Sequence, residues 1–134
     1  MSTVTLIDYG AGNLRSLRAA FERVGAAVDV AAEAAEVDAA ERLVLPGRVV
    51  AIDWAARVPH MGWNDVAGDQ GSAVCYFAHS FAVDCEPGLV AGRTPIDDRQ
   101  VPTVVRSGRL SGVQFHPEKS AADGRRMLEA WLAA

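Results

Sequence analysis

The chain has 134 residues, 50% of them hydrophobic, and a formal net charge of −4. This length fits one domain, and the apolar content is enough to build a hydrophobic core. The negative charge and the lack of a Lys/Arg cluster argue against a nucleic-acid ligand. No stretch is apolar for long enough to span a bilayer, and the N-terminus lacks the pattern of a signal peptide, so we expect no membrane association and a cytoplasmic location.

The first part of the chain predicts a strand, a tight turn and a helix. Val4–Tyr9 is a nearly continuous apolar, β-branched run, as expected for a strand covered on both faces. After the turn Gly10–Asn13, apolar residues recur at helical spacing as far as Val24. Asn13 is a plausible N-cap of this helix and Gly25 a plausible C-terminal stop.

Two further strands and a short helix follow. We expect a strand at Val28–Val30, a polar helix at Glu33–Ala40 and a strand at Arg42–Leu45. Together with the first strand and helix they form a βαβαβ succession. This succession predicts an α/β layered fold with right-handed crossovers.

The second half of the chain is rich in strands without intervening helices. A final helix at Ala121–Ala134 carries an apolar face. The predicted strands are Val49–Ile52, Val74–Ala78, Leu89–Ala91, Val101–Val105 and Leu110–Phe115.

His116 and Glu118 are the strongest chemical pair in the sequence. They follow the apolar run Gly112–Phe115 through Pro117, which cannot donate to a sheet ladder. We therefore expect both side chains at the carboxyl end of a strand, where ligands bind in open α/β sheets. A His followed by a carboxylate can act as a base oriented by an acid. The alternative, a turn His beside a solvated Glu, is less favoured in the context Gln114–Ser120.

Five segments occur in the order found in one protein family. The segments are Asp8–Asn13, Leu45–Gly47, Pro59–Asn64, Tyr76–Phe81 and Gln114–Ser120. With these segments the chain resembles the HisH family, the glutamine amidotransferase subunits of imidazole glycerol phosphate synthase in histidine biosynthesis. This family belongs to the class I glutamine amidotransferases and implies a flavodoxin-like α/β sheet with helices.

The resemblance implies roles for individual residues. In this family, a cysteine on a Gly-x-Cys-x-Gly turn attacks the side-chain amide of glutamine, and ammonia is released. His116 would be the general base, Glu118 would orient it, and backbone groups of Ser80 and Phe81 would contact glutamine. The family partner is the cyclase subunit, which is a (β/α)8 barrel that receives the ammonia in a heterodimer. Residues implied at this interface are Asn13, His60, Met61, Gly62, Trp63, Asn64, Tyr76 and Lys119.

The Gly-x-Cys-x-Gly segment itself is absent. Gly47 runs directly into Arg48–Val50, which resembles a strand that lies well downstream in the family. The simplest explanation is an internal deletion near Gly47–Arg48 that removes the oxyanion loop, the central nucleophile strand and neighbouring helices. We therefore predict one internally shortened domain over residues 1–134. Either its third strand moves next to the downstream strands in a narrower sheet, or the chain is marginally stable and aggregates.

Neither cysteine is a convincing replacement nucleophile. Cys75 lies inside an apolar strand, where burial raises a thiol pKa, and Cys85 stands between Asp84 and Glu86. Neither has the elbow geometry that presents a nucleophile above a sheet, and two such cysteines make no disulfide framework. We predict that glutaminase activity is absent or vestigial, which leaves open whether the chain is an enzyme.

Other patterns give weaker signals. Gly10–Gly12 after a strand suggests dinucleotide binding, but Arg15 occupies the third glycine position. His60, His79 and His116 lack the close spacing of metal ligands, and we interpret the first two as structural or interface residues. We therefore predict neither a cofactor nor a metal site. Two alternatives to an inactive glutaminase subunit remain: a non-catalytic module that docks on the cyclase, and a degenerate product without a role.

Overall fold

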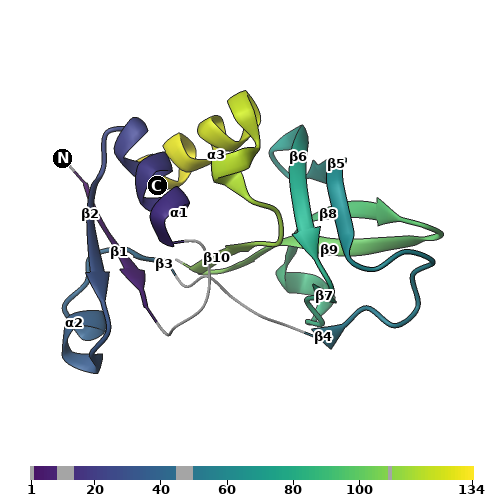
Figure 1. The fold of residues 1–134 in the computed structure, drawn as a ribbon, viewed down its shortest axis with the longest axis horizontal. Helices are drawn as coiled ribbons and strands as arrows, with labels where there is room; N and C mark the ends of the chain where they lie inside the picture. The colour runs from purple at the N-terminus through teal and green to yellow at the C-terminus, as the bar shows by residue number, and fades with distance from the viewer. Residues whose placement is uncertain (1, 9–13, 45–49, 109) are drawn as a thin grey trace. The chain divides into compact units, whose positions relative to one another are not determined.

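The computed structural model describes residues 2–8, 14–44, 50–108 and 110–134 (Figure 1). Two compact units are present: Met1–Gly47 together with Arg125–Ala134, and Arg48–Gly124. The predicted turn Gly10–Asn13, with its N-cap and interface residue Asn13, and the segment Leu45–Val49 lie outside the described residues. The organisation of residues 1–134 as one domain stays a prediction.

The first unit contains the predicted βαβαβ succession. Its sheet has the strand order β2-β1-β3, and both strand pairs are parallel. The elements are β1 (Thr3–Ile7), α1 (Leu14–Arg23), β2 (Ala27–Ala31), α2 (Ala34–Asp38) and β3 (Leu43–Val44). The α/β character predicted for this part of the chain is therefore confirmed.

Gly25 ends α1 as predicted. Its φ angle of 86° lies in the left-handed region that glycine tolerates without strain. The Gly25 N–H donates to the Glu22 carbonyl, and the Ala26 N–H donates to the Phe21 carbonyl. This pair of hydrogen bonds is the Schellman motif, which satisfies carbonyl groups left open at a helix end.

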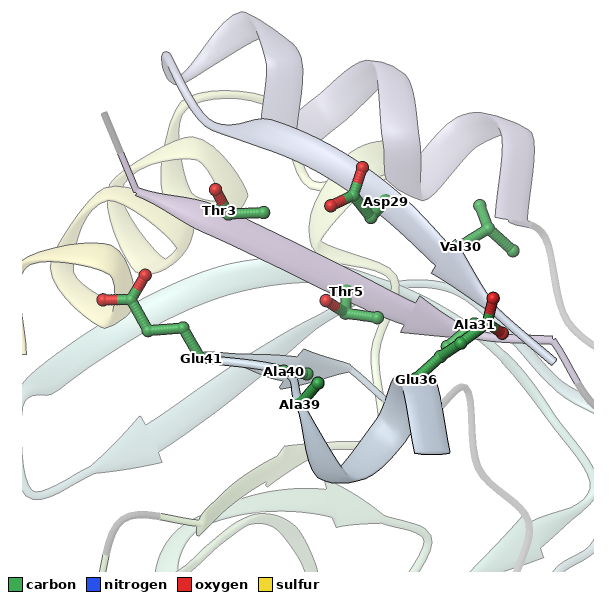
Figure 2. Close-up of a pocket in the computed structure, with 9 residues that line it drawn as sticks. All are labelled: Thr3, Thr5, Asp29, Val30, Ala31, Glu36, Ala39, Ala40 and Glu41. Carbon is green, nitrogen blue, oxygen red and sulfur yellow. The ribbon is translucent and has the colours of Figure 1, made fainter. Parts of the chain in front are cut away.

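The two faces of β1 are different. Val4 and Leu6 point into a core shared with Phe21 of α1 and Leu128 of the last helix, α3 (Ala121–Ala133). Side chains alternate along a strand, so the threonines of β1 point to the opposite face. This face borders a hollow of about 560 Å³ beside α2, and Figure 2 labels the residues that line it. Its lining residues are Thr3, Thr5, Asp29, Val30, Ala31, Glu36, Ala39, Ala40 and Glu41.

The second unit is built on antiparallel strands, which Figure 1 shows as two long hairpins. The larger sheet has the order β10-β9-β8-β5-β6, and β4 pairs with β7 in a separate two-stranded sheet. Its elements are β4 (Val50–Ala51), β5 (His60–Gly68), β6 (Gly71–His79), β7 (Phe81–Ala82), η1 (Pro87–Leu89), β8 (Val90–Ile96), β9 (Arg99–Ser107), β10 (Leu110–Val113) and η2 (Pro117–Lys119).

Three expectations need correction. β5 was not predicted, because its residues Gly62, Asn64 and Asp65 are weak strand formers, and the two-residue strand β7 was not predicted either. The strand before His116 belongs to an antiparallel sheet, so the rule for carboxyl ends of parallel strands does not apply to it. Among the described residues β3 pairs with β1 and with no downstream strand, so the narrower sheet anticipated for the third strand is not found.

No described helix combines the length and apolar character needed to cross a membrane.

The core of the second unit contains a buried pair of threonines that allows a test of its packing. Thr94 Oγ1 and Thr103 Oγ1 lie 2.8 Å apart, and both residues are fully buried. Thr94→Val leaves the Thr103 hydroxyl without its partner and should lower the free energy of unfolding by about 1–3 kcal/mol in urea titrations. The double variant Thr94→Val/Thr103→Val should cost less than the sum of the single variants; additive costs would contradict the interpretation.

Candidate functional site

His116 and Glu118 form the hydrogen bond that the sequence predicts. His116 Nδ1 lies 2.9 Å from Glu118 Oε1. The Glu118 side chain is 1% exposed, whereas that of His116 is 32% exposed. The carboxylate is therefore held inside the protein and the ring meets solvent. This arrangement leaves His116 Nε2 as the nitrogen that could take a proton from another group.

The backbone around this pair is fixed to β6. The His116 N–H donates to the Tyr76 carbonyl at 2.9 Å, and the Tyr76 N–H donates to Ser120 Oγ at 2.9 Å. The Ser120 hydroxyl in turn donates to the His116 carbonyl at 2.7 Å. Ser120 is 1% exposed, so these bonds are shielded from water. The turn that carries His116 and Glu118 is thus bound to one strand residue at two points, and a third hydrogen bond closes the turn on itself.

The first turn of α3 lies directly against this segment. A Cβ atom added at Gly124 would overlap the Pro117 carbonyl and come within 2.8 Å of Ser120 Cβ. Asp123 Oδ2 accepts a hydrogen bond from the Val74 N–H at 2.7 Å. No role was predicted for Gly124 or Ser120, although Ser120 ends the motif that contains His116.

Cys75 is a core residue, as predicted. It lies on the inner side of β6 and is 0% exposed. Burial raises the pKa of the Cys75 thiol to about 11; the negative charge of Asp123 adds to this rise, and a hydrogen bond with Ser120 opposes it. Cys85 is a free, half-buried cysteine in the irregular segment between β7 and η1. Cys75 lies within a strand, and Cys85 has no glycine within two residues on either side, so neither matches the Gly-x-Cys-x-Gly turn.

The predicted glutamine contacts lie in the segment that follows β6. The Ser80 carbonyl accepts a hydrogen bond from the Ile52 N–H at 2.9 Å, and Phe81 is paired with Ala51 of β4. The Phe81 carbonyl lies 2.7 Å from His79 Nδ1. These backbone groups therefore already have protein partners, and their role toward glutamine stays a prediction.

Several predicted interface residues gather on the outer side of the β5–β6 hairpin. Trp63 lies directly opposite Tyr76, and their rings meet edge to face with centroids 5.9 Å apart. Lys119 Nζ lies 5.9 Å from the centre of the Tyr76 ring. Met61 and Trp63 are 62% and 56% exposed. We call Met61, Trp63, Tyr76 and Lys119 the aromatic face.

The predicted interface segment His60–Asn64 divides between the two sides of β5. His60, Gly62 and Asn64 lie opposite His79, Phe77 and Cys75, on the inner side of the hairpin. His60 Nδ1 is 2.7 Å from His79 Nε2. Sequence reasoning missed this contact because it depends on the strand register, although it did interpret both rings as structural or interface residues. Among the described residues, no group of three or more His, Cys, Asp and Glu side chains could hold a metal ion.

Several known proteins with similar sequences are HisH subunits of imidazole glycerol phosphate synthase. The chain is 30% identical to imidazole glycerol phosphate synthase subunit HisH of Rhodopirellula baltica, in an alignment of 200 positions that covers 98% of this chain and 97% of that protein. It is 31% identical to the HisH subunit of Mycobacterium leprae, with 97% of each covered. A shorter alignment with the HisH subunit of Thermotoga maritima is 42% identical and covers 64% of this chain. No protein-family model matches the chain.

Two solved structures share the α/β fold. PurLQS from Thermotoga maritima superimposes with a TM-score of 0.77 at 15% identity, and the match covers 98% of both chains. A putative GMP synthase protein from Thermoplasma acidophilum gives a TM-score of 0.72 at 14% identity, covering 99% of this chain and 94% of that one. At these identities the likeness concerns the fold alone.

Gly124→Ala tests whether close packing of α3 holds the turn of His116. Alanine favours a helix by about 1 kcal/mol over glycine, but the overlap with Pro117 should cost about 1–3 kcal/mol. We expect a net loss of stability in thermal unfolding and a longer His116–Glu118 distance. In the control Gly88→Ala, where nothing lies within 4 Å of the added Cβ, stability should stay equal or rise. Equal effects at both glycines would contradict the packing argument.

Proposed function

The chain belongs to the HisH family of imidazole glycerol phosphate synthase subunits, and we propose that it is an internally shortened member that docks on the cyclase subunit without hydrolysing glutamine. The observation that carries this proposal is a base and its acid in working geometry, with His116 Nδ1 2.9 Å from Glu118 Oε1, beside two cysteines that are both unsuited to attack. Such a chain keeps the residues expected as general base and orienting acid but lacks the nucleophile.

The length of the alignment supports an internal loss. It has 200 positions and the chain has 134 residues, so at least 66 positions, 200 less 134, contain no residue of this chain. The match still spans 97% of the relative, so the missing positions fall inside the sequence rather than at its ends. The boundary between the two compact units, Gly47–Arg48, coincides with the proposed join.

The parallel sheet supports the loss of covering helices. Parallel sheets are normally covered by helices on both faces. Here Val4 and Leu6 are buried in the core with α1 and α3, while the threonine face of β1 borders a hollow of about 560 Å³. Within the described residues of the first unit, the short α2 and the segment after it line this hollow with the threonines, and a deletion that removed neighbouring helices accounts for such limited cover.

The two thiols explain why we propose no glutaminase activity. A nucleophilic cysteine needs thiolate character and access to substrate. Cys75 has neither, because it is fully buried and its pKa is raised to about 11. Cys85 lacks the glycine-flanked turn that presents a nucleophile to substrate. Loss of an oxyanion donor would cost a further factor of about 100–1,000 in rate.

The aromatic face supports docking. Trp, Tyr and Met are enriched at the centres of protein interfaces, and Trp and Tyr often carry much of the binding energy. Trp63 and Met61 are more than half exposed although they are large and apolar. Lys119 adds one positive charge beside the Tyr76 ring. The proposed partner surface is therefore apolar at its centre, with an acidic group within reach of Lys119.

We expect no enzymatic ammonia release from glutamine by the purified chain, alone or mixed with a cyclase subunit. The measurement is a coupled ammonia assay, with His116→Ala as the matched control that lacks the base. Equal backgrounds in both proteins are the expected result. Glutamine-dependent release that is lost in His116→Ala would overturn the inactive assignment, and Cys75→Ala and Cys85→Ala would then identify the nucleophile.

Trp63→Ala should weaken binding to the cyclase by at least about tenfold in calorimetric titrations, because central interface aromatics commonly contribute about 2 kcal/mol or more. Leu110→Ala is the matched control, since Leu110 is 74% exposed on β10 and lies outside the aromatic face. It should leave the dissociation constant unchanged.

Failure of the unaltered chain to bind, despite a folded circular dichroism spectrum, would contradict docking. Failure to bind together with an unfolded spectrum would favour a degenerate product without a role.

A further inference from the structure

His60 and His79 face each other across the β5–β6 ladder, on its inner side. Their rings meet edge-on with centroids 4.9 Å apart, and His60 Nδ1 lies 2.7 Å from His79 Nε2. The Phe77 ring packs against both, at 5.0 Å from His60 and 5.5 Å from His79. His79 is 7% exposed. Two ring nitrogens this close in an apolar setting must share a single proton between them.

The partners of the two rings give this hydrogen-bond chain a direction. His79 Nδ1 lies 2.7 Å from the Phe81 carbonyl, which can only accept, so the proton of neutral His79 is on Nδ1. His79 Nε2 is then an acceptor, and His60 Nδ1 must be the donor. His60 Nε2 is left as an acceptor, 3.2 Å from the amide nitrogen of Asn64.

Asn64 fixes the other end of the chain. Its Nδ2 group also donates to the Pro95 carbonyl at 2.9 Å, and its Oδ1 atom accepts from the Asp65 N–H at 2.8 Å. The amide cannot turn over without losing both bonds. Every contact from Asn64 to Phe81 therefore has one donor and one acceptor, and both rings are neutral in the Nδ1–H form.

We propose that this chain of Asn64, His60, His79 and Phe81 is an acid-sensitive latch that joins β5, β6, β7 and β8 while both rings are neutral. A proton added to His60 enters at Nε2 and faces the amide hydrogens of Asn64. A proton added to His79 enters at Nε2, faces the Nδ1–H of His60, and forces that ring to move its proton to Nε2, again against Asn64. Either protonation breaks at least one bond of the chain.

The surrounding groups favour the neutral rings on balance. Burial lowers the pKa of both His60 and His79 below the ordinary value of 6.5, and His79 also disfavours charge on His60. His116, which is bonded to Glu118, also disfavours charge on His79. Asp97 in the β8–β9 turn favours charge on His60, but this is the smallest of its effects. The hydrogen bond to Phe81 favours charge on His79 without overcoming burial.

These directions determine how stability depends on pH. In the unfolded chain both histidines take up protons near their ordinary pKa of 6.5, whereas in the folded chain they resist protonation. The unfolded state then binds more protons in acid. The stabilisation is fully present above the unfolded pKa and is lost as the pH falls below it, until the folded pKa is reached.

The first test is tautomer-resolved ¹⁵N nuclear magnetic resonance of the full chain at about pH 8, where both rings are neutral. Both His60 and His79 should carry their proton on Nδ1, although free histidine prefers Nε2. An Nε2–H form of either ring would overturn the proposal. This measurement needs no variant, so it remains decisive even if substitutions prevent folding.

The second test compares thermal unfolding between about pH 8 and pH 5, the range in which histidine changes charge. The unfolding midpoint temperature of the unaltered chain should fall by several degrees between these two pH values. The variant His60→Phe/His79→Asn, which keeps an aromatic ring against Phe77 and a donor to the Phe81 carbonyl, should lose less. The control Leu110→Ala should keep the loss of the unaltered chain, because Leu110 is exposed on β10, at the opposite end of the sheet order from β5 and β6, and all three histidines are retained. An unchanged loss in the double variant would overturn the proposal.

Discussion

The structure of the candidate site depends on how the edge of β6 is satisfied. β6 is the outermost described strand of its sheet, and an open edge leaves backbone groups without partners. Tyr76 uses both of its backbone polar groups on the turn that carries His116 and Glu118, donating to Ser120 and accepting from His116. The N–H and C=O groups of one strand residue point to the same side of the strand. Because those of Tyr76 point away from β5, Tyr76 and Trp63 form a non-hydrogen-bonded pair. In such a pair the two side chains lie closer together than in a hydrogen-bonded pair. One set of bonds therefore positions both the base and the aromatic face.

The pairing of β5 with β6 places sequence neighbours with different proposed roles on opposite sides of the hairpin. Residues that alternate on β5 and β6 fall on opposite sides of the hairpin, so His60 and Met61 are neighbours in sequence but belong to the latch and to the aromatic face, respectively.

Glu118 has a buried oxygen atom that stability alone does not explain. Its Oε2 atom has no hydrogen-bond partner among the described residues. An unsatisfied buried oxygen costs stability. A turn shaped for stability alone would not keep it, which fits the proposed origin of this pair in a glutamine amidotransferase.

The sequence predicted what depends on local patterns. The apolar run of β1, the stop at Gly25 and the pairing of His116 with Glu118 were all readable, because each is decided within a few residues. β5 was missed because its glycine and amide residues are poor strand formers, and it is stabilised instead by nine cross-strand pairs with β6. The contact between His60 and His79 joins residues 19 positions apart. Only the register brings them together, and a shift of one residue would turn the two rings to opposite faces.

The boundary between the two compact units explains how the described part of the site could persist after the proposed internal deletion. His116, Glu118 and Ser120, the aromatic face and the latch all lie within Arg48–Gly124, and each contact described for them is made inside that unit. A loss at Gly47–Arg48 removes none of these contacts. It acts instead on the parallel sheet, whose threonine face borders the hollow. The contacts that position His116 and the aromatic face therefore differ from the contacts that a nucleophile strand would make in the parallel sheet. The former can persist when the latter are lost.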